Sequence, residues 1–484
     1  MATFKRDDSF LEKISIGAVG TQKVFEHLKQ DDHIPIELER GSMSYKIWKK
    51  IKIKRIRVPD ILCVNNGIRI ESRAKTKLEI TMSHSVSDPE RGWDSGLKDN
   101  DYVALVVCKK IGERAVDWLA EDPIQYISVK DLREAEAKKQ AVFVKPKGAT
   151  EGFEARITWP ASIASASGVV KNITGNRIQF LREPDKRVIS LNLTKKGIDT
   201  TPLVRVGEKI SENQIIASTV PVSQAISSQV VNENYYLSHL ESTSLSDRYT
   251  AVKALSLFTL PEVKEELIKK LGDENEHIYV KLEAAAGLAK FGTEEGYNFI
   301  TLCLGDSYLQ NVLEAVIILS EIQSEKSSAL LAGVLEDVNQ DAEIRAGAAW
   351  GLGELNGKSY LPSLIKSFDS IDVTIKEEAA RALAKLTGNF STDILHKFRH
   401  AHPVQKPGLA WALTKSKTLT LAQLIEALND EDSRHWISYI IGMQGEETYV
   451  SEIERLKEKD PEVYFAVTVL WKIMSSWVYQ LTEY

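Results

Sequence analysis

The sequence predicts a multidomain chain in which a mixed α/β domain and a small all-β domain precede an array of paired helices. Three observations support this division. A β-hairpin pattern spans residues 57–83, and short strands separated by Gly, Pro and Asn turns occupy residues 143–222. Helical apolar spacing then recurs with a period near ~31 residues. We place the domains at 1–142, 143–228 and 229–484.

The composition is that of a soluble globular protein. Hydrophobic residues make up 43% of the 484 positions and charged residues 27%. The chain has no apolar run of the roughly eighteen residues that a membrane span needs, and its first residues lack the apolar core of a signal peptide. We therefore expect a cytoplasmic protein with no membrane partner. Its three cysteines are far apart in sequence, which favours buried reduced thiols over a disulfide.

Charge is distributed unevenly along the chain. Residues 1–150 carry 28 Lys and Arg against 23 Asp and Glu, and residues 151–230 carry 10 against 7. Residues 231–484 carry 24 against 38, a net charge of −14. Only the first half is therefore suited to a polyanion such as nucleic acid.

The first predicted element is a short amphipathic helix over residues 21–30, which follows Gly20. Val24, Phe25 and Leu28 lie on one side of it, and Glu26 is also on this helix.

A basic stretch follows at residues 46–57, where lysines and arginines are interleaved with isoleucines. The alternation predicts a strand that buries isoleucines on one face and presents cations on the other. Such cations give sequence-independent affinity for a nucleic-acid backbone. An alternative is an edge strand that its lysines protect from aggregation. We expect the phosphate contacts to come from Lys49, Lys52, Lys54 and Arg57.

Residues 57–83 predict two strands joined by an Asn65-Asn66-Gly67 turn. Asp60 lies on the first strand, while Glu71, Arg73 and Lys75 alternate on one face of the second. Adjacent strands are about 4.8 Å apart, so an acid on each could share a divalent cation. A metal-assisted phosphodiester hydrolysis needs this pair of acids and a nearby cation. The alternative is a cross-strand ladder of salt bridges on a solvated face.

Pro59-Asp60, ten residues and then Glu71 resemble the motif of the PD-(D/E)xK nuclease superfamily, and the resemblance covers roughly residues 20–130. It implies a small mixed sheet and a Mg²⁺ or Mn²⁺ cofactor bound by Asp60 and Glu71. In this superfamily an acid from the first helix can complete the metal shell, which implies a role for Glu26, or for Glu37 or Glu39 just beyond it.

The sequence departs from that motif at the position of the basic residue. The superfamily's lysine usually stands two residues after the second acid, where this chain has Arg73. Lys75 follows two residues later on the same face. The resemblance therefore implies that Lys75, together with Arg73, stabilises the scissile phosphate and positions water. Arginine does not readily give up a proton, so Arg73 is not expected to act as a general base.

The remaining strands of the first domain are expected at residues 102–108 and just before a charged helix near residues 130–139. In the middle domain, the run PLVRVGEKISENQIIASTV is similar to the closing motif of barrel-sandwich hybrid domains of the biotinyl and lipoyl type. It lacks the modified lysine of those domains. The resemblance therefore implies a docking or substrate-guiding module.

The helical array places one apolar residue of each repeat in register. Small residues inside the units, such as Ala284-Ala285-Ala286-Gly287, allow close helix packing, and the units resemble short HEAT repeats. The resemblance implies an α-solenoid that presents a surface to a protein partner. The residues in register are Leu255, Leu288, Leu319, Leu352, Leu383, Leu413, Ile441 and Leu470.

Together these features predict a Mg²⁺-dependent nuclease that hydrolyses DNA, with RNA as the alternative substrate, and a solenoid for docking. A homodimer would supply the two active sites that a double-strand cut requires. Fusion to a solenoid suggests, by analogy, a component of a bacterial defence or repair system. The alternative is a non-enzymatic adaptor with a degraded nuclease site, which Arg73 favours. Similar arrays also serve as chromophore lyases or glycosylases, but the acidic solenoid and the basic hairpin region argue against these.

Overall fold

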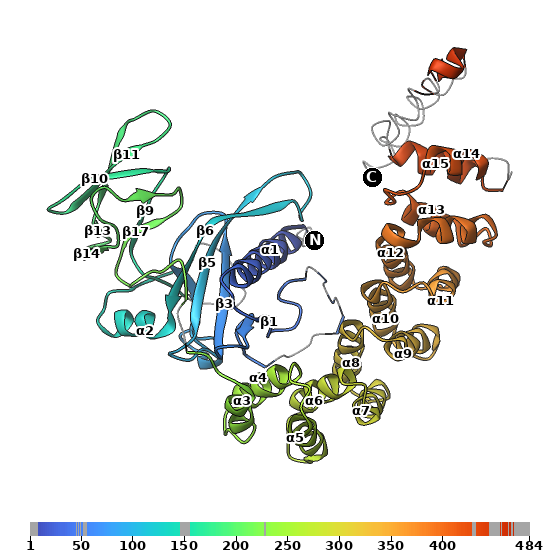
Figure 1. Ribbon diagram of the computed structural model, residues 1–484, viewed down its shortest axis with the longest axis horizontal. Coiled ribbons are helices and arrows are strands. Elements are labelled where there is room, and N and C mark those ends of the chain that lie inside the picture. Colours follow the sequence, from blue (N-terminus) through green and yellow to red (C-terminus); the bar gives the residue numbers. More distant parts are fainter. Residues whose placement is uncertain are drawn as a thin grey trace, which may run out of the picture. The chain divides into compact units, whose positions relative to one another are not determined.

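The computed structural model describes residues 8–44, 46, 48, 50–51, 56–145, 155–226, 229–427, 432–444, 455, 457–462, 464–465 and 468. The chain forms two compact units (Figure 1). One contains Met1–Ile47 and Arg55–Glu266, and the other contains Trp48–Lys54 and Leu267–Tyr484.

The first unit is built on a mixed five-stranded sheet in the order β1-β2-β3-β5-β6. β3 and β5 are parallel, and the other neighbouring pairs are antiparallel. The strands are β1 Pro35–Glu37, β2 Ile61–Cys63, β3 Ile68–Lys75, β5 Tyr102–Lys110 and β6 Trp118–Ser128.

The predicted hairpin is present. Cys63 pairs with Ile68 across the turn, and Gly67 adopts a φ of 72°, which favours glycine. The first strand is shorter than the sequence predicts, because β2 begins only at Ile61. Pro59 has no amide hydrogen for a ladder, and the carbonyl of Asp60 instead accepts hydrogen bonds from the loop after β1.

The two faces of the sheet are covered differently. Helix α1, Asp8–Gln30, packs on one face, where Val24 and Leu28 join a core with Ile70 and Val106 (Figure 1). The other face carries Val103, Leu105 and Val107 of β5, which pack in a second core with α2, Val129–Ala137. These three valine and leucine positions pair with Glu71, Arg73 and Lys75 of β3. The charged row of β3 therefore faces away from α1.

Helix α1 is longer than the sequence predicts, because it begins at Asp8 and continues through Gly17 and Gly20. Gly20 permits a close approach to the sheet. A Cβ at this position would lie 2.3 Å from the Cβ of Ala74. In the sequence Gly20 indicates the start of a helix. In the structure it lies inside α1, where the close packing against Ala74 requires a residue without a side chain.

The strands predicted between residues 155 and 222 are present as short elements. They form a four-stranded sheet β12-β11-β10-β16, a three-stranded sheet β15-β17-β9 and a β13-β14 pair around a core that includes Val170 and Phe180. β8 pairs with β4 and β7. The bounds are β4 Thr81–His84, β7 Val142–Val144, β8 Ala155–Thr158, β9 Ala161–Ile163, β10 Gly168–Thr174, β11 Arg177–Arg182, β12 Val188–Asn192, β13 Thr194–Lys195, β14 Ile198–Asp199, β15 Thr201–Pro202, β16 Lys209–Ile210 and β17 Ile215–Ser218. A 3-10 turn, η1, spans Pro89–Arg91.

The C-terminal helices form a HEAT-like solenoid, as the sequence predicts. In the second unit α6, α8, α10 and α12 pack in succession as one layer, with α7, α9 and α11 on the other side (Figure 1). The helices are α3 Glu233–His239, α4 Leu245–Leu255, α5 Pro261–Gly272, α6 Ile278–Lys290, α7 Glu294–Leu304, α8 Leu309–Glu321, α9 Glu325–Glu336, α10 Ala342–Leu355, α11 Leu361–Lys366, η2 Ser367–Asp369, α12 Val373–Arg399, α13 Lys406–Leu413, α14 Leu421–Ala427 and α15 Arg434–Gln444. α12 is interrupted at Phe390.

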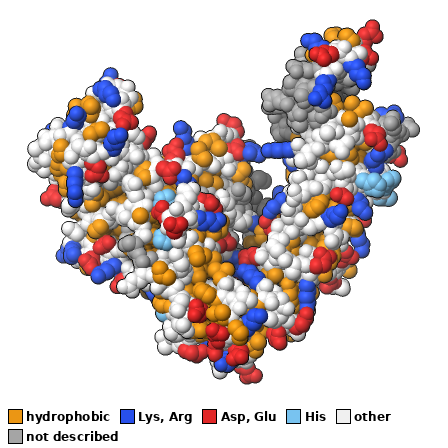
Figure 2. Space-filling model, in the orientation of Figure 1, with side chains coloured by type: hydrophobic (Ala, Val, Ile, Leu, Met, Phe, Trp, Pro, Cys, Tyr) orange, Lys and Arg blue, Asp and Glu red, His pale blue; other side chains and the backbone are white. Residues whose placement is uncertain are grey.

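The register residues of the repeats are buried on these helices. Leu288, Leu319, Leu352 and Leu383 lie on α6, α8, α10 and α12 and are at most 3% exposed, while Leu470 lies outside the described residues. Acidic and basic side chains are interspersed over the solenoid face seen in Figure 2. In the described part of the chain, every helix is too short or too polar to cross a membrane.

We predict that Gly20→Ala destabilises the packing of α1 on β3 by about 1–3 kcal/mol, because the added methyl group overlaps Ala74. Hydrogen–deuterium exchange of the β3 amides, measured by mass spectrometry, should accelerate. Gly17→Ala is the matched control, since a Cβ there has no neighbour within 4 Å. It should stabilise the helix by about 0.5–1 kcal/mol. Equal behaviour of the two variants would contradict this packing.

Candidate functional site

Asp60 lies in the turn that leads into β2, beside the charged row of β3. Its backbone carbonyl accepts hydrogen bonds from the amides of Leu38 and Glu39, at 2.7 and 3.3 Å. Its side-chain Oδ2 accepts a 2.7 Å hydrogen bond from the amide of Ser72. These contacts hold the carboxyl group at the junction of β1, β2 and β3.

The environment of Asp60 disfavours its ionised form. Burial raises the pKa of this carboxyl group well above its usual value, and the nearby Glu71 and Glu39 carboxylates raise it further. The hydrogen bond from Ser72 and the charge of Arg73 act in the opposite direction but do not compensate. The Asp60 carboxyl group is therefore within electrostatic reach of two other acids, Glu71 and Glu39.

Glu71 and Arg73 form an ion pair on the same face of β3, with Nη2 3.0 Å from Oε1. The Glu71 side chain is 15% exposed and that of Arg73 is 40% exposed. The Nε atom of Arg73 is buried and has no hydrogen-bond partner. Arg73 thus neutralises Glu71 in part and retains a donor for a further acceptor.

Lys75 is at the end of the same row, where its Nζ donates to the carbonyl oxygens of Glu79 and Thr81 at 3.0 and 2.5 Å. Burial lowers the pKa of this amine to about 8, and the neighbouring Arg73 charge contributes. A substantial neutral fraction is therefore present just above neutral pH. A neutral lysine can accept a proton, which Arg73 cannot.

The structure brings together Asp60, Glu71 and Arg73, with Lys75 next to Arg73, but it does not bring Glu26 to them. Glu26 lies on α1, which covers the opposite face of the sheet, and its 61% exposed side chain pairs with Lys29. The expectation that Glu26 joins the metal ligands therefore has no structural support.

The third acid beside Asp60 is Glu39. The sequence places Glu37 and Glu39 just after the first helix but does not distinguish them. In the structure, Glu37 accepts hydrogen bonds from the hydroxyl group of Ser42 and from the amide of Met43. Its carboxylate therefore stabilises the loop that follows β1. The hydrogen bond from the amide of Glu39 to the carbonyl of Asp60, and the electrostatic effect of Glu39 on that residue, show which of the two acids acts on Asp60.

The donor set at this site suits Mg²⁺ or Mn²⁺. Within the described ranges, no group of three or more His, Cys, Asp or Glu side chains is already arranged to hold a metal. Mg²⁺ is commonly bound by only one or two carboxylates, with water and substrate phosphates completing its shell. Asp60 and Glu71 would meet that requirement, and a cation would relieve the repulsion that raises the pKa of Asp60.

Much of the basic stretch lies outside the described residues. Lys49, Lys52 and Lys54 lie outside the described residues, whereas Arg57 is exposed. The described parts, among them Trp48, Lys50 and Ile51, have no strand assignment. The strand expected here is therefore absent from the part of the stretch that the structure describes. Lys50 and Ile51 instead donate their backbone amides to Glu343 of α10.

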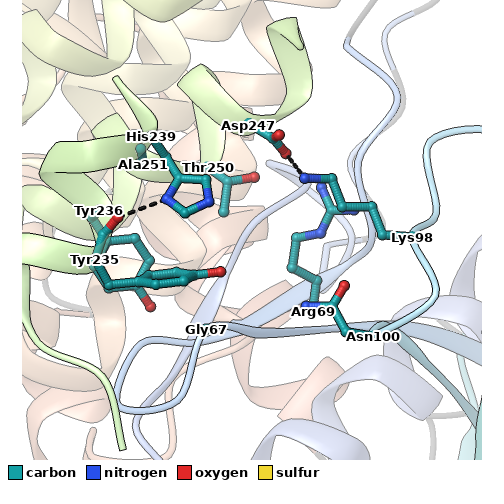
Figure 3. Close-up of a pocket in the computed structure, with 10 residues that line it drawn as sticks. All are labelled: Gly67, Arg69, Lys98, Asn100, Tyr235, Tyr236, His239, Asp247, Thr250 and Ala251. Carbon is teal, nitrogen blue, oxygen red and sulfur yellow. Dashed lines mark hydrogen bonds and ion pairs between the residues drawn. The ribbon is translucent and has the colours of Figure 1, made fainter. Parts of the chain in front are cut away.

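A small polar pocket lies between the hairpin turn and helices α3 and α4, with a volume of about 30 Å³ (Figure 3). Its cations already have acidic partners. Arg69 forms a buried ion pair with Asp101 at 2.6 Å, and Lys98 pairs with Asp247. Arg69 also donates to Ser246 at 2.7 Å. The sequence analysis did not identify this pocket, whose volume and paired charges fit a structural link better than a substrate site.

Residues 344–370 match a family model described as PBS lyase HEAT-like repeat. The match covers most of α10, together with α11 and η2. No sequence among the curated proteins matches this chain.

Three solved structures that resemble parts of this chain are described below. Human deoxyhypusine hydroxylase in complex with glycerol aligns over 44% of this chain and 83% of its own, at 15% identity and a TM-score of 0.20. The complex of CpcE and CpcF of phycocyanin lyase from Nostoc aligns over 43% and 97%, at 17% identity and a TM-score of 0.23. Computationally designed armadillo repeat proteins for modular peptide recognition align over 38% and 100%, at 16% identity and 0.23.

We predict that Asp60→Asn stabilises the folded protein at neutral pH, by about 0.5–2 kcal/mol, the usual gain from one stabilising substitution. The pKa of Asp60 is raised on folding, so its ionisation destabilises the fold as pH rises from below its unfolded pKa through its folded pKa. Asparagine removes the charge and can still accept the amide hydrogen of Ser72. Urea unfolding at pH 4 and pH 7.5 measures the effect.

Asp60→Ala is the control for this prediction. It also removes the charge, but it leaves the amide of Ser72 without its acceptor and should gain less stability than asparagine. If Asp60→Asn lowered the unfolding free energy at pH 7.5, the ionised carboxylate would stabilise the fold through its contacts. That result would contradict the prediction.

Proposed function

We propose that the protein is a metal-dependent nuclease whose active site is formed by Asp60, Glu71 and Lys75, with Arg73 beside them. The observation that carries this proposal is the buried carboxyl group of Asp60, whose pKa is raised by burial and by Glu71 and Glu39. Unfavourable charge that a fold maintains in one place is typical of a functional site. Binding of a divalent cation would relieve this charge while keeping the carboxylate ionised.

The arrangement of the elements supports the same proposal. The chain has a helix, a hairpin with one acid just before its first strand and another on its second, and a following parallel strand, which are the elements that a PD-(D/E)xK core requires. In this proposal Mg²⁺ bound by Asp60 and Glu71 would polarise the phosphoryl group and lower the pKa of a water molecule. Glu39 is the third acid and would add negative charge around the bound metal.

Each basic residue then has a distinct role. The guanidinium group of Arg73, whose side chain is 40% exposed, can donate to a non-bridging oxygen of the scissile phosphate. Lys75, with a pKa of about 8, can orient the attacking water through its Nζ and accept its proton. DNA is the proposed substrate, with RNA as the alternative, and the solenoid is the proposed docking surface for a protein.

A second candidate is a nucleic-acid or protein adaptor that retains the fold without catalysis. The ion pair between Glu71 and Arg73 favours the adaptor, because Arg73 already neutralises an acid that would have to bind the metal in a nuclease. HEAT-like arrays commonly present their surface to partners, which suits a scaffold role.

A plasmid-nicking assay with Mg²⁺ or Mn²⁺ tests the enzyme directly. The full chain should cleave, and Asp60→Asn, Glu71→Gln and Lys75→Met should each lose at least about 100-fold in rate, as expected for removal of a group that stabilises the transition state. Glu26→Gln is the matched control, since this acid is exposed and lies on the opposite face of the sheet. It should retain activity.

The dependence on pH separates Lys75 from Arg73. If neutral Lys75 accepts the proton, the rate should rise with pH through about 8, and Lys75→Arg should remove that rise. Salt-sensitive DNA binding without cleavage at any pH would contradict the nuclease proposal and support the adaptor.

A further inference from the structure

Helix α4 carries the register residue Leu255 of the repeat array, yet it belongs to the first compact unit. Three polar residues of this helix, Ser246, Tyr249 and Lys253, are spaced three and four residues apart and therefore lie on one face. Tyr249 and Lys253 are buried, and lysine is rarely buried without a defined partner. All three form hydrogen bonds with the segments that carry the acids of the candidate site.

The side chain of Lys253 ends at the peptide group between Leu38 and Glu39. Its Nζ donates to the carbonyl oxygen of Leu38 at 3.1 Å, and the Tyr249 hydroxyl donates to the same oxygen at 3.5 Å. The amide on the other side of this peptide group, that of Glu39, donates to the carbonyl oxygen of Asp60 at 3.3 Å. One planar peptide group therefore connects α4 to Asp60.

The ammonium group of Lys253 strengthens this connection. Hydrogen bonds in a chain polarise one another, so a charged donor on the carbonyl oxygen makes the amide of the same peptide group a better donor. That amide forms the longer of the two backbone hydrogen bonds to the Asp60 carbonyl, at 3.3 Å against 2.7 Å for the amide of Leu38. The contact also fixes the backbone of Glu39, the third acid.

Arg69 makes a second link between α4 and the site. It lies on β3 two residues before Glu71, so both side chains are on the same face of the strand. Its guanidinium group donates to the Ser246 hydroxyl of α4 at 2.7 Å, beside the pocket shown in Figure 3. The segment that carries Glu71 and the loop that contacts Asp60 are therefore held by the same face of α4.

We propose that Lys253 is a positioning residue of the metal site, and that a helix of the repeat array therefore controls the metal affinity of the first unit. Lys253 fixes the peptide group between Leu38 and Glu39, which in turn holds the backbone of Asp60. This inference rests on the proposed metal binding by Asp60 and adds its regulation. A displacement of α4, for example by a partner bound to the array, would loosen the acid-bearing loop and weaken metal binding.

Substitutions of Lys253 in the full chain test the proposal, with Mn²⁺ as the probe and calorimetry as the measurement. Lys253→Met keeps an apolar side chain but removes the donor, so the affinity for Mn²⁺ should fall at least about tenfold, as for other residues that orient metal ligands. The Mn²⁺ concentration for half-maximal cleavage should rise by the same factor, while KM for plasmid DNA at saturating Mn²⁺ stays unchanged. Lys253→Arg retains a charged donor and should recover most of the affinity.

Two further variants and a second measurement separate positioning from general stability. Lys290→Met is the matched control, because Lys290 is exposed at the end of α6, and it should bind Mn²⁺ like the unmodified chain. Tyr249→Phe removes only the longer hydrogen bond to Leu38 and should cost less affinity than Lys253→Met. Hydrogen–deuterium exchange should accelerate in Lys253→Met in peptides covering residues 34–44, and remain unchanged in those covering α2.

The outcomes distinguish this inference from the proposed function. Mn²⁺ binding by the unmodified chain that Lys253→Met does not weaken would overturn the positioning role alone. Weaker binding with faster exchange throughout the first unit would also overturn it, because Lys253 would then only stabilise the fold. Absence of Mn²⁺ binding by the unmodified chain would overturn the proposed function and this inference together.

Discussion

The candidate site depends on one constraint, the burial of the Asp60 carboxyl group among other acids. The chain holds this group in place through both its backbone and its side chain, since the carbonyl receives the amides of residues 38 and 39 and Oδ2 receives that of Ser72. The geometry therefore persists even though the charge is unfavourable, because several hydrogen bonds define it. The same contacts bring Glu39 and Glu71 within electrostatic reach, and in the proposed function a divalent cation would relieve the repulsion that follows.

The two cores of the first unit explain why the site is largely buried. Helix α1 seals the opposite face, where Gly20 allows it to approach Ala74 closely. On the charged face, β5 contributes valine and leucine residues to a second core, while Glu71, Arg73 and Lys75 form the row beside it. Low dielectric on both sides strengthens every charge in the row, which is why the pKa values of Asp60 and Lys75 shift in opposite directions toward their neutral forms.

The sequence predicted the features that depend on local patterns. The turn at Gly67, the alternation along β3 and the repeat register of the solenoid follow from residue spacing, and the structure contains all three. It did not predict contacts that depend on tertiary packing. Gly20 resembled a helix boundary because glycine has low helix propensity, and its role becomes clear only beside Ala74. In the sequence, Glu26 and Glu39 were equally plausible as a third acid of the site. Only the structure distinguishes them, because Glu26 is exposed on α1 and Glu39 lies near Asp60. Trp48 and Lys50 suggested a strand, but their partners are some 300 residues away in sequence.

The central claim is that Asp60 is held ready for a divalent cation, and proton release on metal binding tests it most directly. Titrating Mg²⁺ or Mn²⁺ into the full chain by calorimetry, at pH 5.5 in two buffers of different ionisation enthalpy, counts the protons released. Metal binding to a carboxyl group with a raised pKa must displace its proton. The account predicts saturable binding with proton release in the unmodified chain and loss of both in Asp60→Asn. Absence of binding, or binding that is unchanged in Asp60→Asn, would contradict it.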